Sequence, residues 1–215
     1  MEAVMSVLGK IAYYQGQRDE VPNQVLAVEL AQTKNTVGIR EIVNNLENKN
    51  NNIRSDCLKV LYEIGYIDPS LIAGNVNEFL KLLNSKDNRM VWGAMIGLGL
   101  IASQCSKDIW NSIDDVIRVT ESGTVITKVW GMRTLAEVAA KDSFYKQKIF
   151  PILIKQIQSC IPRDVPTHSA SILCAVDHEN EAAFMAVINS RVAELNSAQL
   201  ARLKKVLKKL EQIKE

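Results

Sequence analysis

The stretch IRSDCLKVLYEIG, residues 53–65, decides the fold, because it recurs along the chain. Altered copies follow as MVWGAMIGLGLIA at 90–102, KVWGMRTLAEVAA at 128–140 and, more weakly, PTHSASILCAVDH at 166–178. The four copies start 37, 38 and 38 residues apart. A near-constant period of this size is typical of stacked helical repeats, so we predict a repeat array.

Each copy spaces its apolar residues as an amphipathic helix does. Polar turns such as NKNNN, residues 48–52, separate these helices from their neighbours. No run alternates polar and apolar residues for long enough to indicate a strand. The pattern therefore predicts an all-α chain of helical hairpins, with the core positions of the first copy at Ile53, Cys57, Val60, Leu61 and Ile64.

The hairpins are predicted to form a single domain over residues 1–215. A capping helix is expected at 1–17 and a second one at 196–214, where an apolar stripe lies opposite several lysines. A terminal helix with a polar outer face is what a repeat array needs to cover its last apolar surface. Between the caps we predict five hairpins, at 19–48, 51–84, 88–121, 126–160 and 164–193.

Composition limits the classes of function. The chain has 26 Lys and Arg residues against 24 Asp and Glu residues, a formal net charge of +2, which implies no nucleic-acid partner without a local basic patch. Four cysteines form no C-x-x-C pair, and two histidines leave little for a metal site. We predict no metal and no cofactor, and no catalytic residues stand out.

The start of the chain does not resemble a secretory signal, because it lacks a basic leading region and has Glu2 early. No apolar run reaches the 18 residues of a membrane span. The expected location is the cytoplasm.

The order of a helix, a short polar turn and then a V-R-x-x-A-x-x-x-L helix resembles HEAT repeats. Ile53, Arg54, Cys57 and Leu61 match this pattern best, although Arg54 becomes valine in the next two copies. The resemblance covers residues from about 19 to 193. It implies a right-handed α-α superhelix, an α-solenoid of about five HEAT-like hairpins, that acts as a non-enzymatic scaffold. It also implies that the second helix of each repeat lines a concave groove.

Helical geometry selects the residues of the recurring segments that would face such a groove, opposite the predicted core. Trp92, Trp130 and His168 lie 38 residues apart and would form a ladder. Tryptophans are enriched at binding hot spots, so a peptide or an amphipathic helix could lie across them, with Arg133, Lys59 and Lys141 fixing its acidic groups. The predicted partner-binding residues are Tyr62, Trp92, Ile96, Trp130, Arg133, Glu137 and His168.

Two alternatives stay open at this point. The tryptophans could fold into the gap between repeats beside Gly93 and Gly131 and simply belong to the core, because tryptophan is usually largely buried. The chain could also be a HEAT-like DNA-binding protein or an alkylpurine DNA glycosylase, since some such glycosylases have this fold. That chemistry needs a carboxylate beside an aromatic cradle, for which Glu137 near Trp130 is the candidate, and a basic groove for phosphates.

Overall fold

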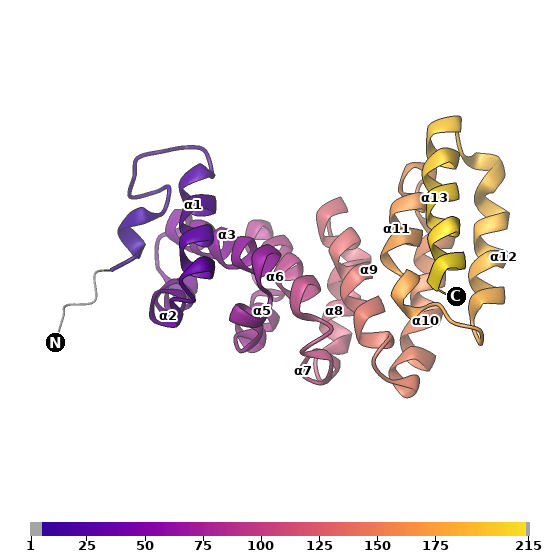
Figure 1. Ribbon diagram of the computed structural model, residues 1–215, viewed down its shortest axis with the longest axis horizontal. Helices are drawn as coiled ribbons and strands as arrows, with labels where there is room; N and C mark the ends of the chain where they lie inside the picture. The colour runs from indigo at the N-terminus through magenta and orange to yellow at the C-terminus, as the bar shows by residue number, and fades with distance from the viewer. Residues whose placement is uncertain (1–5, 214–215) are drawn as a thin grey trace. The chain divides into compact units, whose positions relative to one another are not determined.

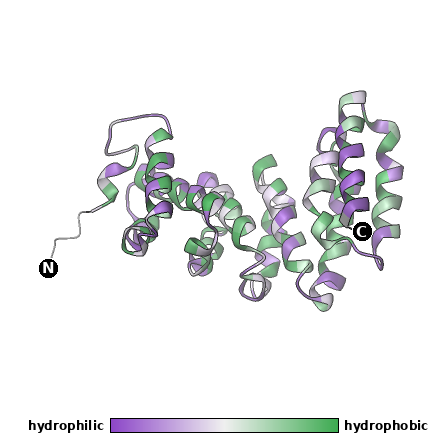
Figure 2. Cartoon of the chain, in the orientation of Figure 1, coloured by the Kyte–Doolittle hydropathy of each residue, from purple (hydrophilic) through white to green (hydrophobic). Residues whose placement is uncertain are grey.

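A computed structural model describes residues 6–213, with side chains to residue 212. Throughout this range the regular structure consists of α-helices and short 3-10 turns, without a strand, which confirms the all-α prediction. The chain divides into two compact units, Met1–Asp115 and Val116–Glu215. Figure 1 shows their helices coloured in chain order. Figure 2 shows that hydrophobic and hydrophilic residues both occur along the helices, as expected of helices that bury one face.

The first unit stacks helices in two layers. In one layer α3 packs between α1 and α6, and in the other α2 packs on α3, and α5 packs on both α6 and α7. The 3-10 turns are Leu8–Lys10 and Asn45–Glu47, and α8 crosses the boundary between the units. The helices are α1 (Val21–Gln32), α2 (Thr36–Asn44), α3 (Asn51–Ile67), α4 (Ser70–Ala73), α5 (Val76–Leu82), α6 (Asn88–Ile101), α7 (Ser106–Trp110) and α8 (Ile113–Ser122).

The second unit repeats this arrangement. In one layer α11 packs between α9 and α13, and in the other α10 packs against α12 and also against α9 (Figure 1). Three 3-10 turns, Pro162–Asp164, Leu173–Ala175 and Val192–Glu194, join the helices. The helices are α9 (Val125–Ala139), α10 (Ser143–Ser159), α11 (Val165–Ser171), α12 (Glu181–Arg191) and α13 (Ser197–Ile213).

The polar turns of the sequence are helix caps in the structure. Side-chain oxygens of Asn35, Asn50, Asp87 and Asp142 each accept a hydrogen bond from a backbone N–H in the first turn of the following helix. These bonds satisfy donors that have no partner within the helix. The caps explain why helices α2, α3, α6 and α10 begin where they do.

The recurring segments bury the predicted face. Ile53 is 4% exposed, and Cys57, Val60, Leu61 and Ile64 are fully buried, which confirms the predicted core of the first copy. Glycines in these helices let neighbouring elements approach. A Cβ at Gly97 would lie 2.7 Å from the Phe79 ring, and one at Gly131 would overlap Thr120, whose Oγ1 donates to the Val116 carbonyl.

The predicted N-terminal helix is only partly described, since residues 1–5 lie outside the described range. From Ser6 onward the expectation is wrong, because a 3-10 turn and further turns replace a regular helix. Buried Asn23 accepts a hydrogen bond from the Ala12 N–H at 2.9 Å and donates to Asp56, which also accepts from the Tyr13 N–H at 2.7 Å. These side chains offer the backbone donors partners outside a helix.

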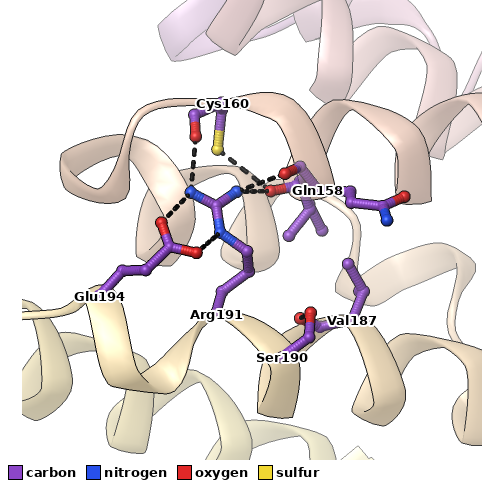
Figure 3. A network of polar contacts seen from close by, with 7 residues as sticks. Gln158, Cys160, Val187, Ser190, Arg191 and Glu194 are labelled. Carbon is purple, nitrogen blue, oxygen red and sulfur yellow. Dashed lines mark hydrogen bonds and ion pairs between the residues drawn. The ribbon is translucent and has the colours of Figure 1, made fainter.

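A buried arginine joins α12 to the end of α10 (Figure 3). Arg191 is 6% exposed and donates to the carbonyls of Ile157, Gln158 and Cys160 at 2.6, 2.7 and 2.7 Å. Its other guanidinium N–H groups pair with both carboxylate oxygens of Glu194 at 2.8 Å. The last carbonyls of a helix have no intrahelical donors, so Arg191 satisfies them and places a positive charge at the negative end of the α10 dipole.

Candidate binding surface

An aromatic cluster lies where α3 meets α6 in the first unit. The ring centroid of Tyr62 is 6.2 Å from that of Trp92 and 6.3 Å from that of Tyr66. Tyr62 is buried, Trp92 is half-buried and Tyr66 is exposed. The recurrence of the segment therefore brings two predicted residues, Tyr62 and Trp92, into one cluster, and its accessible edge is formed by Trp92 and Tyr66.

Lys59 is tied to this cluster and to two carboxylates. Its Nζ lies 2.9 Å from Glu20, 2.7 Å from Glu63 and 4.9 Å from the centroid of the Tyr62 ring. Burial alone would lower the pKa of Lys59, but the bonds to Glu63, Glu20 and Tyr62 outweigh it and raise that pKa. Desolvation raises the pKa of Tyr62 to about 12, with Lys59 opposing the shift. The charge that we expected to meet a partner is already paired within the unit.

The second unit carries a different arrangement on α9. The guanidinium carbon of Arg133 lies 5.1 Å from the centre of the Trp130 ring, within the range of a cation–π contact. Arg133 is exposed, whereas Trp130 and Glu137 are half-buried. Within residues 6–213 no carboxylate forms a salt bridge with Arg133. Arg133 is thus held by an aromatic ring while its charge stays open to solvent.

A trough lies beside Arg133, between α9 and α11. Its volume is about 380 Å³, and its floor consists of small side chains. At its edge, Arg202 of α13 donates to Thr167 Oγ1 at 2.6 Å. The lining residues are Arg133, Glu137, Thr167, Ala170, Ser171 and Cys174.

Two predicted groove residues of the other copies are buried. Ile96 is 6% exposed and His168 is 4% exposed, so neither offers a surface to a partner, and the same holds for Tyr62, which is 5% exposed. The Nδ1 atom of His168 is buried without a hydrogen-bond partner, and burial lowers the pKa of this imidazole. The predicted place of His168 on an exposed ladder is therefore wrong. The helix phase explains it, because Val165, Ser169 and Ile172 are fully buried and His168 falls on their side of α11.

The trough is lined on α11 by Thr167, Ala170 and Ser171, and in the following 3-10 turn by Cys174. Sequence reasoning missed them and Arg202. Their spacing of three, four and seven residues was a readable signal of one helix face. The period itself holds here, because Val165, Ser169 and Ile172 are buried like the residues 38 positions earlier, Thr127, Gly131 and Thr134.

No group of three or more His, Cys, Asp or Glu side chains suited to a metal ion occurs in the described part of the chain. None of the helices within residues 6–213 is long and apolar enough to cross a membrane.

Comparison with known proteins supports the fold. No protein-family model matches the chain, and no curated protein matches its sequence. An engineered protein of a structural genomics consortium is similar with a TM-score of 0.63 and 18% identity, over 97% of this chain and 98% of that one. A designed armadillo repeat protein in complex with the peptide (KR)4 has a TM-score of 0.64 and 14% identity, over 94% and 99% of the two chains.

A natural protein, Kap121p, is similar with a TM-score of 0.65 and 13% identity, over 88% of this chain and 22% of that one. At these identities the likeness concerns the fold alone. The fold is that of the HEAT-like and armadillo-like helical-repeat solenoids.

Proposed function

We propose that this helical-repeat solenoid is a non-enzymatic scaffold that binds a peptide or a helix on the layers formed by α1, α3 and α6 and by α9, α11 and α13. One observation carries the proposal. Arg133 lies over Trp130 at the edge of an open trough whose floor consists of small side chains. An aromatic residue and an arginine beside a shallow depression are the residue types found at interface hot spots.

The first unit supports the same function with other residues. Trp92 and Tyr66 are accessible beside the buried Tyr62, and aromatic rings with a polar edge are suited to partly hydrated interfaces. Among proteins of similar fold, one designed armadillo protein holds the peptide (KR)4 and another was designed for modular peptide recognition. Peptide binding is the activity that we carry over to this chain.

The arrangement on α9 favours binding of a peptide over excision of an alkylated base. An alkylated base carries a positive charge and would need a free aromatic face. Arg133, which is also positively charged, already lies over the Trp130 ring and would repel the base. Glu137 lies seven residues after Trp130, about 10 Å farther along the helix axis at 1.5 Å per residue. The carboxylate is therefore displaced from the ring that would hold the base.

Selection from a random peptide display library on the immobilised protein tests this function. Peptides that bind the wild type are measured again with Trp92→Ala and with Trp130→Ala, and each variant is checked for folding by circular dichroism. We expect weaker binding with at least one folded variant. The matched control is Lys155→Ala on α10, an exposed residue of the other layer, which should bind as the wild type does.

Two results would count against the proposed function. Selected peptides that bind both tryptophan variants unchanged but lose affinity for Lys155→Ala would move the site to the other layer. Loss of the folded state in both tryptophan variants would identify these residues as core. In that case Arg133→Ala, which removes an exposed side chain, takes their place in the binding measurement.

A further inference from the structure

The two units differ in charge. The segment Met1–Asp115 has 11 Lys and Arg residues against 14 Asp and Glu residues, a formal net charge of −3. The segment Val116–Glu215 has 15 against 10, a formal net charge of +5. The small net charge of the whole chain therefore conceals a basic second unit, and charge asymmetry of this kind bears on the choice of partner.

The positive charge of the second unit gathers on the layer of α9, α11 and α13. On α13, Arg202, Lys205 and Lys209 fall within about 60° of one another around the helix axis, at 100° per residue. Arg202 donates to Thr167, which lines the trough, so the Arg202 end of this row lies at the edge of the trough. Arg133 stands on the opposite side, on α9. Two guanidinium groups therefore flank a floor of small side chains.

These cations have few carboxylate partners of their own. Within residues 6–213, no salt bridge involves Arg133, Lys141, Arg202, Lys205 or Lys209. Lys59, in the first unit, is by contrast paired with both Glu20 and Glu63. Glu137 is the acidic residue among those that line the trough. Guanidinium groups that have no carboxylate partner are suited to carboxylates, which they bind through two parallel hydrogen bonds.

The trough is better suited to a peptide than to a nucleic acid. Stacking of bases needs a free aromatic face, and Arg133 covers that of Trp130. The trough is instead lined by the short side chains of Thr167, Ala170 and Ser171, which leaves room for a peptide chain and its side chains. We infer that the surface of α9, α11 and α13 binds an acidic peptide segment, whose carboxylates pair with Arg133 and Arg202. This inference rests on the proposed function.

Fluorescence anisotropy with two labelled octapeptides, (DE)4 and (KR)4, tests the inference on the full chain. At a salt concentration of about 0.15 M, where screening is physiological, we expect (DE)4 to bind and (KR)4 not to bind. Arg133→Gln should weaken the binding of (DE)4 by about fivefold, as expected for one partly exposed ion pair. Glu137→Gln should strengthen it, because this change removes a like charge from the trough.

Lys155→Gln on α10 is the matched control, since it removes an exposed positive charge from the other layer and should leave the binding of (DE)4 unchanged. Preference for (KR)4, or equal loss of affinity in Lys155→Gln and Arg133→Gln, would overturn the inference. Tighter binding of oligo-dT than of (DE)4 would also overturn it and identify a surface for phosphates. Failure of the proposed function looks different, because library peptides of any charge would then be insensitive to the variants on this layer.

Discussion

Replacement of Arg191 by methionine should destabilise the second unit by about 3 kcal/mol. The change keeps most of the side-chain volume but removes three bonds to carbonyls and the pair with Glu194 (Figure 3). Ile157 is fully buried, so its carbonyl suffers the full penalty of an unsatisfied group, about 1–3 kcal/mol. Gln158 is exposed, and its carbonyl can turn to water at a smaller cost.

Loss of the positive charge at the end of α10 adds about 0.3–1 kcal/mol. Urea denaturation followed by far-ultraviolet circular dichroism measures the sum. With a slope of about 1–3 kcal/mol per molar, the midpoint of the second unit should fall by at least about 1 M. Glu194→Gln should lower the free energy of unfolding by less than Arg191→Met does. The Glu194 side chain is 46% exposed, and its replacement leaves the bonds from Arg191 to the carbonyls in place.

The control for this prediction is Arg202→Met, which removes an exposed arginine with a single bond to a side chain. It should change the free energy of unfolding by less than about 0.5 kcal/mol, as is usual for surface substitutions. An Arg191→Met variant as stable as Arg202→Met would refute the reasoning. The carbonyls of Ile157, Gln158 and Cys160 would then be satisfied without the guanidinium group of Arg191.

Three further substitutions test how the units are packed. Gly131→Ala should lower the free energy of unfolding by about 1–3 kcal/mol through overlap with the neighbouring helix, whereas Gly74→Ala, with open space around its Cβ, should be neutral or slightly stabilising in urea melts. Asn23→Leu should speed hydrogen exchange of the Ala12 amide, which donates to Asn23, and of the Tyr13 amide, which donates to Asp56, the partner of Asn23. Unchanged exchange of both amides would contradict the role of the Asn23 side chain. The Lys146 hydrogen bond lowers the pKa of Asp177 below its ordinary 3.8, so the stability that this carboxylate contributes is present above that value and is lost as the pH falls through the lowered pKa. Asp177→Asn should therefore lose less stability than the wild type between neutral pH and pH 3 in urea titrations, and equal losses would count against the pair.

The sequence predicted the fold because its signal is repeated. One helix phase, set by Ile53, Cys57 and Leu61, could be carried forward along the chain, and capping residues marked where helices begin. The N-terminal segment departed from its apolar pattern because Asn23 and Asp56, distant in sequence, take its backbone donors. Such pairings between distant residues leave no periodic trace.

The candidate surface was predictable only in part, because the period alone does not show which face of each helix its neighbours cover. Trp92 and Arg133 lie at accessible positions of α6 and α9, but His168 lies on the side of α11 that is buried with Val165 and Ser169. The pairing of Lys59 with two carboxylates also had no signature, because one of them, Glu20, lies 39 residues away. Whether these surfaces bind a partner stays a prediction.

A map of amide chemical shifts tests the central claim most directly. The protein, labelled with ¹⁵N, is titrated with a peptide selected on the wild type, and the perturbed amides are assigned to helices. The account predicts perturbations on the exposed sides of α9 and α11, centred on Arg133 and Ser171, with any further ones on α3 and α6. Perturbations confined to α10 and α12, with α9 and α11 unchanged, would contradict it.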